Sequence, residues 1–231
     1  MAETRKTVGK YLRYSFGELI LLVVGILLAL QINNYNDNRK SKGELRTILT
    51  IVRNDLSSNL KDADFLIKNY ETEMSLLNKM LDSATVDSII DHCPRCFSLN
   101  TSFADLVLNQ RGLELLKQYK SQHSVSSDSL ILFIDALYTD MTKYNKTMVD
   151  LINVDVLDNL KFYRDNFDWF EKFLEGDVSR ETAEEILDNV KSRNRLLHYR
   201  VLIGSNYLRL LKSFKEEGEI IKQKLDKRLA E

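Results

Sequence analysis

The feature that most constrains this chain is a continuous apolar run near its start. Twelve consecutive residues, Leu19 to Leu30, carry no polar side chain. Seventeen residues, Phe16 to Ile32, are the short end of what crosses a bilayer core at about 1.5 Å per residue. Aromatic residues flank this run, as they do at membrane interfaces: Tyr11, Tyr14 and Phe16 before it and Tyr35 after it.

These observations predict a transmembrane helix over residues 16–35. A short basic tail, residues 1–15, precedes it, and a helical extramembrane domain, residues 36–231, follows. The alternative is a cleaved signal peptide, but the residues after the run, Gln31 to Asn34, provide no small-x-small cleavage site. Basic residues are balanced across the span, so the positive-inside rule leaves its orientation open: Arg5, Lys6, Lys10 and Arg13 before it, and Arg39, Lys40, Lys42 and Arg46 after it.

The segment GKYLRYSFGELILLVVGILLALQINNYNDNRK resembles the opening of an uncharacterised family of Bacteroidetes membrane proteins. A weaker similarity covers FADLVLNQRGLELLK, Phe103 to Lys117. The chain departs from that family at Tyr35, where the family usually has tryptophan. The resemblance implies a single-pass inner-membrane protein with its C-terminal domain in the periplasm, and it implies no known activity.

Two features of the predicted span are candidates for function. Glu18 stands at the edge of the apolar run, and a carboxylate in lipid is costly to ionise, so it can act as a proton carrier in an ion-coupled motor or transport subunit. The simpler interpretation places Glu18 among the lipid headgroups at the positive end of the helix. Gly25 and Ala29 form a small-x-x-x-small step that lets two membrane helices approach closely, although such steps also occur by chance.

The remaining length suits one domain with a core of its own. One proline, eight glycines and 29% charged residues favour long helices. The net charge of −1 argues against a nucleic-acid partner.

Apolar residues recur at steps of three and four from Leu45 to Leu81, where ten intervals cover 36 residues. This period of about 3.6 residues predicts one long helix in a globular bundle, in preference to an extended heptad coiled coil. Similar stepping predicts a helix from Leu130 to about Tyr163 and a last helix from Ser179 or Thr182 to the C-terminus. The fold class is therefore all-α, with one N-terminal transmembrane helix followed by a bundle of long antiparallel helices.

Between these helices the sequence predicts shorter features. Asp82 to Thr101 is expected to be irregular, and Ser102 with Asp105 is expected to open a helix that runs to about Arg111. Gly112 then marks a turn or kink. Ser121 to Ser129 is expected to be a loop, with Ser126 or Ser127 capping the helix that follows.

Both cysteines lie in His92-Cys93-Pro94-Arg95-Cys96. A local disulfide between Cys93 and Cys96 is favoured, because it fits an oxidising compartment and needs no further group. Free thiols and a metal or redox site are the alternatives. A zinc site would need ligands from His92, His123 or His198, and a redox dithiol usually occurs in a βαβ setting.

Six aromatic residues stand within twelve positions, Phe162 to Phe173. If exposed, they would indicate a partner or membrane surface. The favoured interpretation is that they pack at the end of the bundle, where a turn joins two helices. The residues are Phe162, Tyr163, Phe167, Trp169, Phe170 and Phe173.

No phosphate-binding, nucleophile-elbow or zinc-protease motif occurs in the sequence. We therefore expect no enzyme activity, no cofactor and no metal. The expected function is a membrane-anchored helical scaffold or accessory subunit of an envelope complex, with the lipid bilayer and a protein partner or second copy as its contacts. A periplasmic ligand-sensing domain and an ion-coupled subunit using Glu18 are the alternatives.

Overall fold

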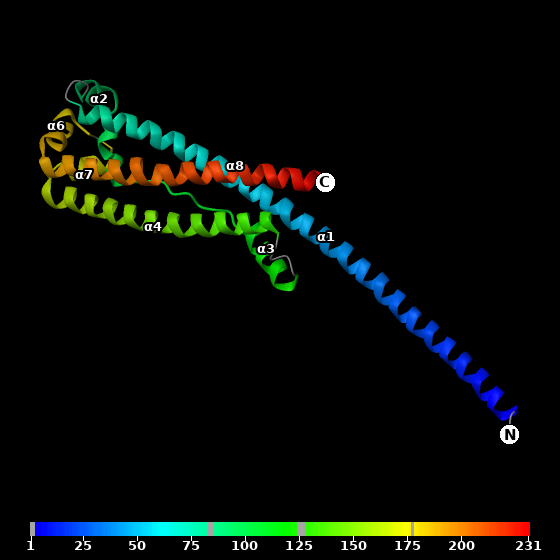
Figure 1. Ribbon diagram of the computed structural model, residues 1–231. Helices are drawn as coiled ribbons and strands as arrows, with labels where there is room; N and C mark the ends of the chain where they lie inside the picture. The colour runs from blue at the N-terminus through cyan, green and yellow to red at the C-terminus, as the bar shows by residue number, and fades with distance from the viewer. Residues whose placement is uncertain (1–2, 83–85, 124–127, 177) are drawn as a thin grey trace. The chain divides into compact units, whose positions relative to one another are not determined.

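The computed structural model describes residues 3–82, 86–123, 128–176 and 178–231, and for residues 3–17, 20, 86, 90, 94 and 95 it describes the backbone alone. All regular secondary structure in these ranges is helical, which confirms the all-α class (Figure 1). The elements are α1 (Glu3–Leu81), α2 (Val86–His92), the 3₁₀ helix η1 (Pro94–Thr101), α3 (Arg111–Gln122), α4 (Ser129–Asn166), α5 (Phe170–Leu174), α6 (Arg180–Asp188), α7 (Val190–Arg200), the π-helix η2 (Val201–Tyr207) and α8 (Leu208–Ala230).

The chain divides into two compact units, residues 1–48 and residues 49–231. The first holds the N-terminal part of α1, including the apolar run. The second holds the rest of α1 and every later element. The boundary predicted after residue 35 stays a prediction.

The second unit is built on three long helical segments. Contacts between α1 and the α7–α8 segment run in opposite directions along the two segments. Arg53 of α1 bonds Asp226 of α8, and Asn78, later in α1, bonds Arg200, earlier in the other segment. Contacts between α4 and the same segment also run in opposite directions, from Asp128 with Arg228 to Arg195 with Asp158. The α7–α8 segment is therefore antiparallel to both α1 and α4.

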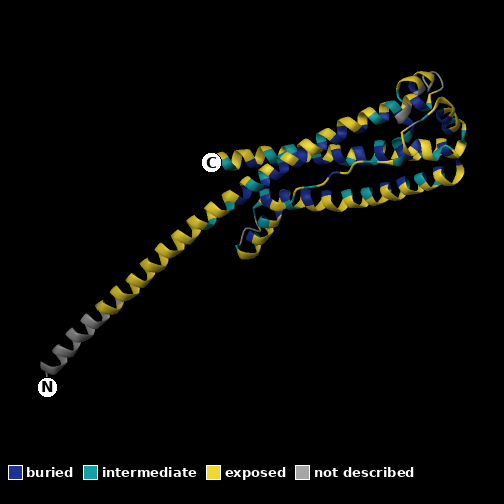
Figure 2. Ribbon diagram, turned by 180° about the vertical axis from the view of Figure 1, so that it is seen from behind, coloured by how far each residue is buried: buried dark blue, intermediate teal, exposed yellow. Residues whose placement is uncertain are grey.

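The apolar stripe of α1 forms much of the core, as its period predicts. Figure 2 shows the buried positions on the facing sides of the long helices. Val52, Leu56, Ala63 and Leu77 of α1 have no exposed surface, and neither do Ile131, Ile134 and Ile152 of α4 nor Leu196, Leu211 and Leu225 of the last segment.

The apolar stepping that predicts the buried face of α4 is wrong in its second half. Its residues are Leu130, Ile134, Leu137, Met141, Tyr144, Met148 and Leu151. Tyr144 and Leu151 are about half exposed, and the buried positions there are Ile152, Val156, Asn159 and Tyr163. The buried face of α4 includes a fully buried asparagine, so the apolar spacing alone does not follow it.

The helix predicted from Ser102 to Arg111 is also wrong. Residues 103–110 are extended, and α3 begins at Arg111. This segment runs between the long helices (Figure 2), and its backbone groups bond to their side chains. Gly112 is therefore in the first turn of α3 and marks no turn or kink. Its missing side chain allows close packing, since a Cβ there would lie 2.6 Å from the backbone nitrogen of Val52.

Three further boundaries differ from the expectations. The stretch expected to be irregular contains α2 and η1. Asp128 caps α4, its carboxylate accepting from the Leu130 amide at 3.0 Å, whereas Ser126 and Ser127 lie outside the described residues. Ser179 caps α6 as predicted, but the last helix is interrupted: Asn189 caps α7, and η2 separates α7 from α8.

Candidate functional site

The apolar run lies in the first unit, where its large side chains are exposed. Leu21 is 72% exposed, Leu22 61% and Ile32 63%, and the large side chains of Leu19 and of Val23 to Leu30 are about half exposed. Glu18, Gly25 and Ala29 are exposed in the same unit. The side chains of Phe16, Gly17 and Ile20, and those of the basic tail, lie outside the described part of the chain.

Within the residues whose side chains are described, no helix contains a stretch long and apolar enough to cross a membrane.

The two cysteines meet at the junction of α2 and η1. Their Sγ atoms are bonded at 2.00 Å, with the Cα atoms 5.4 Å apart. The backbone amide of Cys96 donates to the carbonyl of Cys93 at 2.9 Å, so the bond closes a single tight turn. Neither this pair nor any other described group brings together three side chains able to hold a metal ion.

The aromatic residues after α4 contact one another. Tyr163, Phe167 and Phe173 are buried, and the ring of Trp169 stacks on Phe167 with centroids 4.7 Å apart. The Trp169 indole Nε1 donates to a carboxylate oxygen of Glu185 at 2.9 Å. These rings pack against each other where the chain turns from α4 toward α6, and do not form one exposed patch.

A groove lies between α4 and α7, and no motif or spacing in the sequence predicts it. It encloses about 810 Å³. Leu151 and Val154 of α4 and Leu202 of η2 line one end, and Asn166 of α4 and Lys191 of α7 line the other. One end is thus apolar and the other polar.

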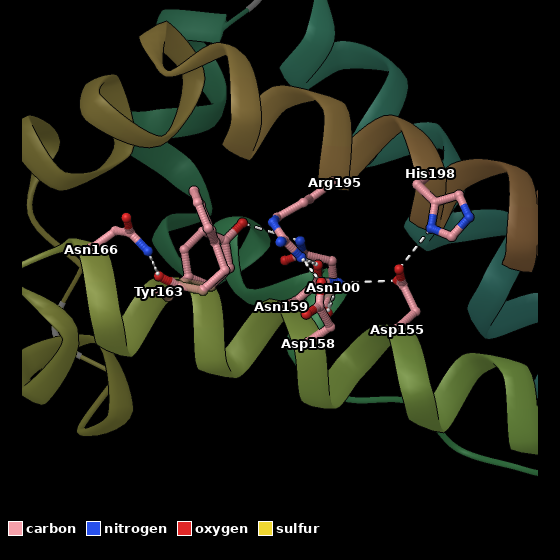
Figure 3. Close-up of polar contacts among 9 residues, drawn as sticks. Asn100, Asp155, Asp158, Asn159, Tyr163, Asn166, Arg195 and His198 are labelled. Atoms are coloured by element: carbon pink, nitrogen blue, oxygen red, sulfur yellow. Dashed lines mark hydrogen bonds and ion pairs between the residues drawn. The ribbon is translucent and has the colours of Figure 1, made fainter.

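Two hydrogen-bonded side-chain pairs form the middle of this groove (Figure 3). The Arg195 guanidinium donates to Asp158 Oδ2 at 2.6 Å and to Asn159 Oδ1 at 2.8 Å, and it lies 4.3 Å from the centroid of the Phe162 ring. His198 Nδ1 lies 2.7 Å from Asp155 Oδ1. An ionised carboxylate only accepts, so Nδ1 carries the proton of this bond.

A buried polar chain continues inward from the groove (Figure 3). Asn159 donates to Asp155 Oδ2 at 3.1 Å and to the Asn100 carbonyl at 2.9 Å. Asn100 then donates to the Tyr163 hydroxyl at 3.1 Å. Asn100, Asn159 and Tyr163 have no exposed surface, and burial raises the pKa of Tyr163. The Asn100 Oδ1 atom is buried and has no hydrogen-bond partner within the described residues. These bonds fix the orientation of Asn159 and of the Asp155 carboxylate, which lines the groove.

A second polar set holds the extended segment. Asn59 of α1 makes two bonds to the Asn109 backbone, accepting from its amide at 2.8 Å and donating to its carbonyl at 2.9 Å. Asn145 of α4 donates to the Leu106 carbonyl at 3.0 Å. The Tyr207 hydroxyl accepts from the Leu106 amide at 2.8 Å, and burial raises the pKa of Tyr207 to about 12.

Two more α1 side chains complete this set. The Tyr70 hydroxyl accepts from the Ala104 amide at 3.0 Å and also bonds the Ala104 carbonyl. Asp55, which is 8% exposed, accepts from the Gly112 amide at 2.7 Å. Buried backbone groups need partners, and here side chains of three helical elements take the place of a neighbouring strand.

Part of the chain matches a known family model. Residues 18–106 match DUF6090, a family of unknown function. The match begins at Glu18 and ends at Leu106, inside the extended segment. No curated protein and no solved structure matches the chain.

Proposed function

We propose that this chain is a single-pass, membrane-anchored helical scaffold or accessory subunit, whose second unit binds protein partners through helix faces. The observation that carries the anchor is the exposure of every large apolar side chain from Leu21 to Ile32. Soluble monomers rarely expose so large a contiguous apolar surface, and a helix that is apolar on all sides requires lipid or protein around it. The resemblance of the opening segment to Bacteroidetes membrane proteins also supports this proposal.

The anchor is tested by separating membranes from soluble protein after an alkaline carbonate wash. The wild-type chain should remain with the membranes. Replacing Val24 and Leu27 together with arginine should release it, because each arginine near the centre of a span costs about 2.5–3.5 kcal/mol. A matched control, Phe65→Arg with Leu174→Arg, adds the same charge at exposed positions of the second unit and should stay membrane-bound. A wild-type chain that washes off would overturn the anchor.

The proposed location of the second unit is the periplasm. The Cys93–Cys96 bond supports this, because disulfides persist in oxidising compartments. A membrane-impermeant maleimide added to intact cells should label the pair only after a reductant is added. Labelling that requires cell lysis would place the domain in the cytoplasm, and labelling without reductant would show free thiols.

The groove favours a second candidate function, ligand sensing. Its apolar and cationic ends and the oriented pairs Arg195–Asp158 and His198–Asp155 suit a small amphipathic anion. Thermal unfolding of the full chain with a panel of small carboxylates would test this. A stabilising carboxylate that loses its effect in Lys191→Ala would support sensing, and a panel without effect would remove this candidate.

A further inference from the structure

The outward side of α4 is a long exposed face, coloured as exposed in Figure 2. At about 100° per residue, one set of positions lies within about 80° of Val154, opposite the buried Ile152 and Val156. Val154 is 68% exposed and Leu157 is 66% exposed. We call the part of this set from residue 143 to the end of the helix the α4 outer face, and its members are Lys143, Lys146, Thr147, Asp150, Leu151, Val154, Leu157, Asp158, Lys161, Arg164 and Asp165.

Charge on this face follows an ordered pattern about its apolar centre. Two lysines and then an aspartate precede Val154: Lys143, Lys146 and Asp150. After Leu157 come Lys161 and then two aspartates, Asp165 in the helix and Asp168 just beyond its end. Read backwards with every sign inverted, this series of six is unchanged. The other two charged members of the face, Asp158 and Arg164, already pair within the chain, with Arg195 and Asp165. Its midpoint lies between Asp155 and Val156.

A sequence with this symmetry is complementary to itself when two copies run antiparallel. In that register Val154 meets the partner's Leu157. Asp150 meets the partner's Lys161, and Lys146 meets the partner's Asp165. A parallel arrangement in register would instead place Lys146 on a lysine and Asp150 on an aspartate, and like charges at an interface disfavour a pairing.

We propose that the α4 outer face binds the same face of a second copy of this chain, antiparallel and related by a two-fold axis near Asp155. The inference rests on the docking role proposed above and names the partner; it does not depend on the anchor. A two-fold contact is isologous, so each complementary pair occurs twice.

The contact is a weak one. At its centre only Val154 and Leu157 are apolar. Each ion pair between exposed side chains adds little to the free energy of association. Arg164 falls opposite Thr147, and within its own chain it already bonds Asp165 at 2.7 Å. Lys146, Asp150 and Lys161 have no ion-pair partner among the described residues, so they are available to a second copy.

Proximity is tested by thiol cross-linking of the full chain in mild detergent, without reductant so that Cys93 and Cys96 stay bonded. In Val154→Cys the two introduced thiols should lie about 4.5 Å apart along the helix direction, since three residues separate them in the antiparallel register. A short bis-maleimide should join the two copies. Phe65→Cys, an equally exposed position on α1, should stay monomeric.

Charge reversal tests the register. In the Val154→Cys background, Asp150→Lys and Lys161→Asp should each lower the cross-linked fraction at limiting concentration about tenfold, because two attractive pairs become repulsive. The double variant restores both pairs and should recover the cross-link. Lys61→Asp, an exposed reversal on α1, should have no effect.

The proposal is overturned if the single reversals change nothing, if the double variant fails to recover, or if Val154→Cys cross-links only to another protein. Its failure is separable from failure of the anchor. All charge variants should remain in the carbonate-washed membranes, so a lost cross-link with retained membrane binding removes the dimer alone.

Discussion

Single polar side chains hold the centre of this fold, and Asn59 is the clearest case. It is 1% exposed and makes both bonds to the Asn109 backbone, with a third to the Tyr138 hydroxyl at 3.2 Å. The amide of asparagine matches the donor and acceptor of one extended residue, as a neighbouring strand would. No apolar period signals such a residue, so its role could not be read from the sequence.

Replacing Asn59 with alanine should lower the free energy of unfolding by about 3 kcal/mol, because two backbone groups of Asn109 lose their partners. Urea denaturation followed by circular dichroism measures it. Asn69→Ala, an exposed change on the same helix, should stay within about 0.5 kcal/mol of wild type. Equal effects of the two changes would refute the bonding role of Asn59.

Gly112 is required by packing and not by a turn. An added Cβ would lie 2.6 Å from the Val52 backbone nitrogen and 2.7 Å from its Cα. Gly112→Ala should therefore destabilise the second unit by about 1–3 kcal/mol, since backbone atoms must shift. In Gly43→Ala nothing lies within 4 Å of the added carbon, and the unfolding midpoint should be unchanged. The same denaturation experiment distinguishes them, and a tolerated Gly112→Ala would show that α3 moves freely from α1.

At the scale of elements, α1 and α8 are joined by charge as well as by apolar contact. Asp64 of α1 bonds Lys215 of α8, and it also pairs with Lys68 at 2.6 Å. These lysines, Lys215 first, lower the pKa of the Asp64 carboxyl from 3.8 to about 2. Because the pKa of Asp64 is lower in the folded state than in the unfolded chain, ionisation of Asp64 stabilises the folded state.

The contribution of Asp64 should be present above about pH 4, the ordinary range of the carboxyl, and should disappear as the pH falls to about 2. Wild type should therefore be more stable than Asp64→Asn near pH 6, and the two should converge near pH 2. Thermal unfolding across this range measures the difference, with Asp62→Asn as an exposed control on α1. A difference independent of pH would exclude the ion pair as its cause.

Regular apolar spacing predicted the helix from Leu45 to Leu81 because one face of α1 meets the core from Ile48 to Met80. The same stepping predicted Val190 and Val201 on the buried face of the last segment, but Val190 is 70% exposed and Val201 is 48% exposed. The helix break at Asn189 and the π-helix η2 each rotate the buried face relative to the preceding helix. Apolar spacing counted across either point therefore combines residues that lie on different faces. The α4–α7 groove was missed for another reason: Arg195 and His198 acquire their partners only when α7 packs on α4.

For the whole molecule, the extended segment implies that the second unit unfolds as one. The backbone groups of the extended segment bond to side chains of α1, α4 and η2. If any of these three elements unfolds, buried backbone groups lose their partners. Native-state hydrogen exchange should give the Leu106 and Asn109 amides the same protection, equal to the global stability. Exchange of Leu106 well before Asn109 would show that η2 opens separately.

The Tyr207 bond to Leu106 also sets an order of events during synthesis. The two residues are 101 positions apart, so at about 5–20 residues per second the Leu106 amide leaves the ribosome about 5–20 seconds before its partner. Until then α1 and the extended segment can only be held in a provisional arrangement. A nascent chain that stops before η2 therefore presents unpaired backbone and uncovered α1 side chains to the chaperones and proteases of its compartment.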